Sequence, residues 1–397
     1  MSAAVIAAAG CTAPDSPTSP LVIGVLSAHT GPGADTADEA RRGAQLAIDI
    51  VNEDHGALSV PLGAGTGLPA LGGSRLALAG ADSQGKPDQA VRMAADLVTA
   101  QGAVGVVVAE SADIVSGTAS EMQRLRAPLL DASNTADYLT ELGLDWYFRA
   151  GPGDRVLTES AFGVLRRQSV RRLAVLTEPG GDSAAGAAHI KALAGASGGQ
   201  IVLQHELTLA DSAGGDVAFR LKESGAQAVL AWAHTPEAAT SMGRLVPTNI
   251  PMVGLGKGFR GLPAPPSGPA LMLRPVPWSA ELATRSPAAQ AVMALYEKRF
   301  GHRMSGLAAA SFTAVITLAV AIDASASRDP ATIRAALRQT SLSSTQMIMP
   351  WDGVRFASDG HNSLAGAAVE AWDGSGFHVV YPVELASRPI KWPGARP

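Results

Sequence analysis

From residue 21 onward the chain alternates short apolar segments with amphipathic segments, and this alternation limits the folds it can adopt more than any other feature. The apolar segments are four to eight residues long, the usual length of strands. The amphipathic segments, such as residues 38–52, repeat small apolar residues every three or four positions, which is helical spacing. This order predicts an α/β fold with parallel sheets flanked by helices.

Two of the apolar segments end in the same way. Residues 21–27 lead into a turn at 28–32, and residues 128–130 lead into a turn at 131–136, and both turns are rich in small and hydroxyl side chains. Ligands of open parallel sheets bind at the carboxyl ends of the strands. We therefore predict that these turns line a cleft for a small polar molecule. Neither turn supplies an obvious reacting group.

The length of the chain predicts two domains. A chain of 397 residues and 40.4 kDa exceeds one ordinary hydrophobic core. The strand–helix pattern restarts near residue 150, and residues 271–277 are interpreted as an extended crossing back to the first part. We predict one lobe from residues 20–149 and 275–347, and a second lobe from residues 150–274 and 348–397. The chain would then cross between the lobes three times.

Charge and hydropathy exclude two classes of partner. The net charge is −4, and the basic residues are scattered, so a nucleic-acid surface is not expected. Aromatic residues make up only 5% of the chain, which leaves few platforms for stacking bases. The longest apolar stretch, 308–322, is interrupted by hydroxyl residues and is shorter than the roughly 18 residues of a membrane span. We expect the body of the protein to be soluble.

The single cysteine, Cys11, excludes an internal disulfide and a cysteine zinc site. A short apolar run precedes it, and a segment rich in Pro, Ser and Thr follows it. This pattern resembles a bacterial lipoprotein signal with a lipidated cysteine, so residues 1–20 are predicted to be a signal remnant and tether. The alternative is an unmodified cysteine in a disordered tail, because the basic segment that opens a signal peptide is missing before the apolar run.

Two glycine motifs lie in the wrong context for chemistry. Residues 256–261 match G-x-G-x-x-G, but a Pro-rich segment follows where a dinucleotide fold needs a helix, so a mobile turn is expected. Residues 195–199 match G-x-S-x-G, but they follow a helix and precede a strand, as a helix end does. No two histidines have metal-ligand spacing. We therefore predict a protein that is not an enzyme and has no catalytic residue, cofactor or metal.

Several polar residues lie where apolar strands are expected to end. His234 follows the strand at 228–233, so it is a candidate to line the cleft. The acidic residues at such ends occur singly, which favours helix capping and cleft lining over paired acid–base chemistry. They are Asp82, Glu110, Asp113 and Asp131.

The order and spacing of these segments resemble a known family. The chain is similar to type I periplasmic solute-binding proteins, specifically the branched-chain (Leu/Ile/Val) amino-acid-binding group of ABC importers. The similarity covers nearly all of residues 20–380. The segments that carry it include 23–32, 43–48, 82–91, 132–136 and 356–360. The resemblance implies two lobes that close on a ligand by a hinge motion.

The resemblance also implies which residues bind the ligand. In that family the first lobe holds the ligand's carboxylate through main-chain N–H groups and hydroxyls of two loops, an arrangement that favours anions at helix starts. Thr135 matches the family's hydroxyl best, and Ser133 matches a main-chain contact. The full set of candidates by position is Thr36, Glu110, Ser111, Ala112, Asp113, Ser133, Asn134, Thr135, His234, Gly256 and Lys257.

The sequence departs from the family pattern in three respects. Asp113 stands where the family usually has Ser, and its charge would oppose a carboxylate. The acidic partner of the ligand's ammonium is replaced by Gly256 and Lys257, and an aromatic residue is replaced by His234. A buried ammonium without a partner is costly. An amide, a carboxylate or an amino acid in another orientation is therefore as plausible as a branched-chain amino acid.

The resemblance further implies a location and a partner. We expect an extracytoplasmic monomer, attached to the membrane only through lipid on Cys11, that delivers a small polar solute to an ABC permease. The alternative is a ligand-sensing receptor of the same fold that acts on a signalling partner. A hydrolase or dehydrogenase would need one of the two glycine motifs in its proper context.

Overall fold

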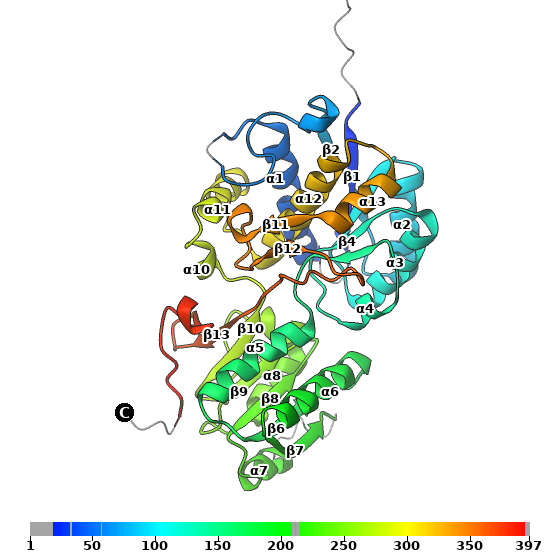
Figure 1. Cartoon of the computed structure of the whole chain (residues 1–397). Coiled ribbons are helices and arrows are strands. Elements are labelled where there is room, and N and C mark those ends of the chain that lie inside the picture. Colours follow the sequence, from blue (N-terminus) through cyan, green and yellow to red (C-terminus); the bar gives the residue numbers. More distant parts are fainter. Residues whose placement is uncertain (1–18, 32–33, 57, 209–210, 212–214, 394–397) are drawn as a thin grey trace, which may run out of the picture.

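In the computed structural model the described residues are 19–31, 34–56, 58–208, 211 and 215–393, and they form two α/β lobes joined end to end (Figure 1). The chain builds the first sheet, then most of the second, then returns to the first lobe before its last strands join the second sheet. It thus passes between the lobes three times. The predicted two-lobe α/β architecture is confirmed.

The sheet of the first lobe is entirely parallel. Its order is β2-β1-β3-β4-β5, formed by β1 (Leu21–Ser27), β2 (Leu76–Asp82), β3 (Ala103–Val108), β4 (Leu129–Asp131) and β5 (Tyr147–Arg149). Every residue of β3 is buried, because helices cover both faces of the sheet. One face packs on α1 (Ala34–Asn52), α11 (Pro287–Phe300), α12 (Gly306–Ser325) and α13 (Pro330–Gln339), and the other on α2 (Pro87–Thr99) and α3 (Ala112–Leu125).

The second sheet is larger and mixed. Its order is β14-β13-β10-β9-β8-β6-β7, formed by β6 (Arg172–Thr177), β7 (Gln200–Glu206), β8 (Ala228–Trp232), β9 (Met252–Leu255), β10 (Met272–Val276), β13 (Ala368–Trp372) and β14 (Phe377–Tyr381). One face packs on α5 (Asp154–Arg167) and α6 (Gly181–Ala196), and the other on α7 (Gly215–Glu223) and α8 (Pro236–Leu245).

The interpretation of residues 271–277 as a crossing is wrong. Most of this segment is strand β10, which pairs in parallel with β9 and antiparallel with β13. The crossing follows it. A strand and an extended crossing share the same local pattern, and the partner strand β13 lies almost a hundred residues further along the chain.

One described helix, α12, is long and apolar enough to span a membrane by length and composition alone. Most of it is buried inside the first lobe, where it packs along α1. The two helices approach closely because Gly43 has no side chain: a Cβ atom there would lie 2.1 Å from the carbonyl oxygen of Ala308. Helix α12 is therefore the central core helix of this lobe.

Hydrogen bonds tie the crossings to one another. The side chain of Asn362 donates to the carbonyl oxygens of Ala150 at 2.9 Å and Gly353 at 3.0 Å. The indole of Trp351 donates to the carbonyl oxygen of Pro277 at 2.6 Å. Met349, Trp351 and other residues beyond position 347 pack in the core of the first lobe, and β13 is the next element that joins the second sheet.

Candidate functional site between the lobes

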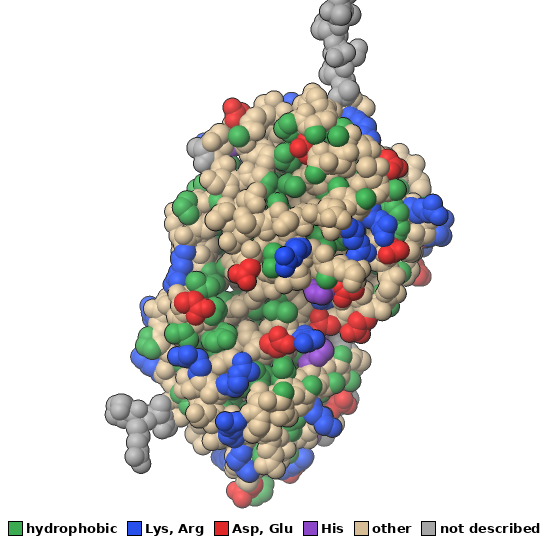
Figure 2. Space-filling model, in the orientation of Figure 1, with side chains coloured by type: hydrophobic (Ala, Val, Ile, Leu, Met, Phe, Trp, Pro, Cys, Tyr) green, Lys and Arg blue, Asp and Glu red, His purple; other side chains and the backbone are tan. Residues whose placement is uncertain are grey.

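Most of the predicted site residues lie just beyond the carboxyl ends of strands. Glu110 and Ser111 follow β3, and Thr135 follows β4 in the first lobe. In the second lobe, His234 follows β8 and Lys257 follows β9. On the face shown in Figure 2, charged and histidine side chains gather where the two lobes meet. This is the edge at which open parallel sheets bind ligands.

The two loops of the first lobe are joined to each other. The side chain of Asn134 donates to the carbonyl oxygen of Glu110 at 2.8 Å, and the Ser83 hydroxyl donates to the Glu110 carboxylate. Burial raises the pKa of Glu110, whereas the Ser83 hydrogen bond and the charge of Lys257 in the other lobe oppose that rise. Lys257 of the second lobe thus acts electrostatically on Glu110 of the first lobe.

The start of α3 presents its N–H groups without a side-chain cap. Ser111 is the N-cap residue, yet its hydroxyl makes no capping hydrogen bond. By contrast, Ser286 and Ser305 each accept a hydrogen bond from the first turn of their helices. Ala112 is buried in that first turn, and Asp113 is exposed. The uncapped turn is thus suited to an anionic group of a ligand.

The loop after β4 already contains an anion of its own. The buried carboxylate of Asp131 accepts hydrogen bonds from the backbone N–H groups of Ser133 at 3.1 Å and Asn134 at 2.9 Å, and from the Tyr147 hydroxyl at 2.9 Å. Burial raises the pKa of the Asp131 carboxyl, and it raises the pKa of the Tyr147 hydroxyl well above its ordinary value. The main-chain donors predicted for the ligand at Ser133 and Asn134 are therefore engaged by the protein itself in this structure.

Thr135 contacts the second lobe directly. Its hydroxyl oxygen accepts a hydrogen bond from Nη2 of Arg260 at 3.2 Å, and its carbonyl oxygen accepts one from the backbone N–H of Asp154 at 2.6 Å. Burial raises the pKa of the Asp154 carboxyl, and the neighbouring Arg260 and Thr135 side chains oppose that rise. Nη1 of Arg260 lies 4.0 Å from Oδ1 of Asp154. This three-residue cluster bridges the lobes.

Arg260 belongs to the segment for which the sequence predicted only a mobile turn. The segment instead forms the short helix α9 (Lys257–Arg260), directly after β9. Gly256 adopts a φ of +83°, and a Cβ atom there would lie 2.4 Å from the carbonyl oxygen of Ala233, so this turn needs glycine. The prediction failed because the Pro-rich stretch after residue 261 concealed a helix of a single turn.

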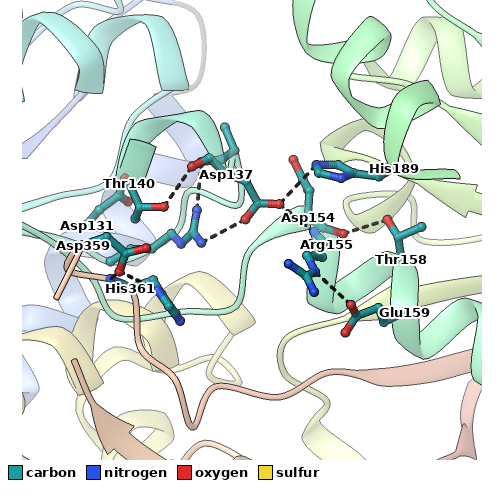
Figure 3. A network of polar contacts seen from close by, with 12 residues as sticks. Asp131, Asp137, Thr140, Asp154, Arg155, Thr158, Glu159, His189, Asp359 and His361 are labelled. Carbon is teal, nitrogen blue, oxygen red and sulfur yellow. Dashed lines mark hydrogen bonds and ion pairs between the residues drawn. The ribbon is translucent and has the colours of Figure 1, made fainter. Parts of the chain in front are cut away.

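A second contact between the lobes centres on Asp137 (Figure 3). Its carboxylate accepts hydrogen bonds from Nη2 of Arg149 at 3.0 Å and from the backbone N–H of Arg155 at 2.8 Å. Nε2 of His189, on α6 of the second lobe, lies 3.4 Å away. Asp137 and His189 were not among the predicted site residues, since nothing local in the sequence marks a pair that forms only across two lobes.

The second lobe contains buried hydrogen-bonding atoms that have no protein partner. Buried atoms without a protein partner include Oγ of Ser183, Nε1 of Trp232 and Nε2 of His234. Conversely, the carboxylate of Glu178 is occupied: it accepts from the backbone N–H of His234 at 2.7 Å and from Thr235.

Two remaining predictions concern the N-terminal part of the chain. Thr36 is exposed in the first turn of α1. Cys11, the predicted lipidation site, lies outside the described residues. Within the described part of the chain, no group of three His, Cys, Asp or Glu side chains could hold a metal ion.

Comparison with known proteins places this geometry in a family. The family model for periplasmic binding proteins matches residues 20–376. A curated relative, the Leu/Ile/Val-binding protein BraC3 of Rhizobium johnstonii, is 28% identical over 221 residues, which is 55% of each chain. This chain thus spans about half the length of the curated relatives that it matches.

Solved structures share the fold. An ABC transporter substrate-binding protein from Desulfitobacterium hafniense in complex with Leu has a TM-score of 0.71 at 19% identity, covering 91% of this chain and 100% of that one. A solute-binding protein from R. palustris in complex with benzoate has a TM-score of 0.67 at 14% identity, covering 95% of this chain and 100% of that one. From these matches and the two-lobe fold, we conclude that the chain belongs to the type I periplasmic binding protein family and is related to its Leu/Ile/Val-binding members.

Proposed function

We propose that this protein captures a small polar solute between its two lobes and delivers it to the permease of an ABC importer. Its work is binding and closure, with no bond made or broken, in agreement with its membership in a family of binding proteins. The solute could be an amino acid or a related amide or carboxylate. The solutes of two proteins of the same fold, Leu and benzoate, fall in these classes.

The observation that best supports this proposal is the meeting of the two lobes at the predicted site. Thr135 and Arg260 are hydrogen-bonded across it, and Asp137 and His189 lie 3.4 Å apart nearby. Each pair would separate if the lobes opened. Residues at the site therefore couple its occupancy to a hinge motion, which is how a binding protein presents two states to a transporter.

The first lobe would hold an anionic group of the solute. The uncapped first turn at Ser111, Ala112 and Asp113 offers N–H groups, and the Thr135 hydroxyl lies in the neighbouring loop. The second lobe would contribute residues around His234 and Lys257. Thr36 stays in the proposed set because its helix starts beyond the carboxyl end of β1.

The location is part of the proposal. We place the protein outside the cytoplasm as a monomer held at the membrane by lipid on Cys11, with residues up to about 20 as the tether. A lipid anchor would keep the binding protein near its permease without a membrane-spanning segment.

A thermal-shift screen over amino acids, amides and small carboxylates tests the proposal. One class should raise the melting temperature, and at 100 times the dissociation constant it should stabilise the protein by about 2.7 kcal/mol. Thr135→Ala should weaken binding of the hit about tenfold, the loss expected for a hydrogen bond to a charged group. Thr99→Ala is the matched control, because Thr99 is exposed at the end of α2 and bonds only to its own helix.

Two outcomes would count against this function. If no small solute in the screen shifts the melting temperature, solute capture is wrong. If a solute binds but Thr135→Ala leaves its affinity unchanged, the solute lies elsewhere and the site between the lobes is wrong.

A further inference from the structure

Arg260 is a cation of the second lobe whose side chain reaches Thr135 of the first lobe. It ends α9, and its side chain is 17% exposed, between Thr135 and Asp154. A guanidinium carries a full positive charge at any physiological pH and has five N–H donors. A cation with so little exposure to water needs hydrogen-bond acceptors or an opposite charge beside it. The identity of those partners decides what charge a solute brings to the site.

The protein satisfies Arg260 only in part. One donor, Nη2, bonds to the Thr135 hydroxyl at 3.2 Å. The Asp154 carboxylate lies 4.0 Å from Nη1, which is longer than a hydrogen bond. Among the described residues these are the two polar contacts of the Arg260 side chain. Other N–H donors of the Arg260 guanidinium therefore remain for a ligand. A carboxylate can accept two parallel hydrogen bonds from such a group.

Most of the carboxylates that could receive an ammonium group have a partner in the protein. The acid nearest the proposed site, Asp154, is the counter-charge of Arg260, 4.0 Å from its Nη1. Asp131 bonds to two backbone N–H groups and Tyr147, and Asp137 bonds to Arg149. Glu178 caps the turn at His234 and Thr235. Glu110 accepts from Ser83. Asp113 is exposed, so of the acids named here it is the least shielded from water.

Two buried groups of the second lobe have hydrogen-bonding capacity that the protein leaves unused. Nε1 of Trp232 and Oγ of Ser183 are buried, lack a protein partner, and belong to side chains only 1% exposed. An indole N–H can only donate. Trp232 ends β8, Ser183 lies in the first turn of α6, and both elements reach the edge that faces the first lobe. Gly186 leaves room for the Trp232 ring against α6, because a Cβ atom there would lie 2.3 Å from it.

From this balance of donors and acceptors we propose that the solute is a carboxylic acid without an ammonium group, and that Arg260 and Thr135 bind its carboxylate from opposite lobes. The inference rests on the proposed solute binding and narrows its ligand class. A carboxylate that enters between the two residues accepts from the Thr135 hydroxyl and the guanidinium together. It thereby replaces the hydrogen bond between Arg260 and Thr135, which is one of the contacts that join the lobes in this structure.

Calorimetric titration of the full chain with matched ligands tests this specificity. Each set keeps the carbon skeleton and changes the charged group: leucine, 4-methylpentanoate and 4-methylpentanamide in one set, and phenylalanine, 3-phenylpropanoate and 3-phenylpropanamide in the other, with benzoate added. In at least one set we expect the acid to bind at least tenfold tighter than the amino acid and the amide. Tighter binding of the amino acid, or equal binding of acid and amide, would overturn the inference.

Substitutions at two arginines assign the preference to a residue. Arg260→Gln should reduce affinity for the acid at least tenfold and narrow its advantage over the amide, while Arg260→Lys should retain part of that advantage. Arg155→Gln is the matched control, because Arg155 is 73% exposed and pairs with Glu159. Thermal unfolding without ligand verifies that each variant is folded. A preference for the acid that survives Arg260→Gln would overturn the role of Arg260.

The experiment separates the two proposals. If an amino acid is the preferred ligand, the proposed solute binding is supported and the proposed preference for an acid without an ammonium group is contradicted. Absence of binding by every compound in the matched sets and in the wider screen removes both.

Discussion

The hydroxyl of Thr135 and the guanidinium of Arg260 are hydrogen-bonded at 3.2 Å, although they belong to opposite lobes and lie 125 positions apart in the sequence. Each residue follows a strand that ends at the same edge, β4 in the first lobe and β9 in the second. The two sheets thus bring two distant loops together without any local sequence relation between them. The polar contacts beside this pair can be tested one at a time.

The Asp137–Arg149 ion pair should be important for stability. The Arg149 side chain is only 5% exposed, and Asp137 is its acidic partner at 3.0 Å. Asp137→Ala would leave a buried guanidinium without that partner, and such losses cost about 3–5 kcal/mol. Urea unfolding should therefore show a much lower midpoint for this variant.

Glu159→Ala is the control for that experiment. Glu159 is 44% exposed and pairs with the exposed Arg155, so its removal should cost about 0.5 kcal/mol or less. If both variants lose the same small amount, the Asp137–Arg149 pair does not support the fold in the way its burial suggests.

Asp131 should make stability depend on pH. Burial raises the pKa of its carboxyl in the folded protein. Above the unfolded pKa of about 3.9, the folded state then binds more protons than the unfolded state, so this group's contribution to stability falls as the pH rises through the folded pKa. Asp131→Asn removes that titration and keeps an oxygen to accept from Ser133 and Asn134.

Urea unfolding of both proteins from pH 4 to pH 8 measures the effect. The free energy of unfolding should fall less, or rise more, with pH in Asp131→Asn than in the unsubstituted protein. Parallel pH profiles would show that the Asp131 carboxyl keeps an ordinary pKa despite its burial.

The sequence was sufficient to predict the two-lobe fold and the points at which its strands end, because both follow from local patterns. Buried strands such as β3 are continuous apolar runs, and polar residues such as Glu110 mark where they end. The predicted site residues were assigned to one edge of the sheets only from their positions after successive strands. The ligand-binding role of each predicted residue stays a prediction.

What the sequence could not reveal depends on contacts between distant parts. Asp131 was interpreted as cleft lining, yet its carboxylate takes the N–H groups of Ser133 and Asn134, a local loop geometry that composition does not determine. The position of Arg260 follows from a one-turn helix whose glycines pack on the backbone near Ala233. The pairing of β10 with β13 requires a partner that the chain supplies only after its return to the first lobe.

Cys11 should determine where the protein is found in the cell. If it carries lipid, the full chain expressed in a bacterium should incorporate an alkyne-labelled fatty acid and sediment with membranes. Cys11→Ser should lose the label and move to the soluble extracytoplasmic fraction, because a tether without an acyl chain has little affinity for lipid. Thr12→Ser is a matched control that leaves the cysteine in place. Membrane recovery of Cys11→Ser would contradict the anchor.

Gly43 should be intolerant of any side chain, because α1 and α12 touch there. A Cβ atom at this position would lie 2.1 Å from the carbonyl oxygen of Ala308, so Gly43→Ala must push the two helices apart. Overpacking of this kind costs about 1–3 kcal/mol. Gly195→Ala is the matched control: Gly195 lies within α6, and nothing stands within 4 Å of its added Cβ atom. Thermal unfolding should show a lower melting temperature for Gly43→Ala and an equal or higher one for Gly195→Ala, since alanine favours helix more than glycine does. Equal melting temperatures for the two variants would show that the α1–α12 contact yields without cost.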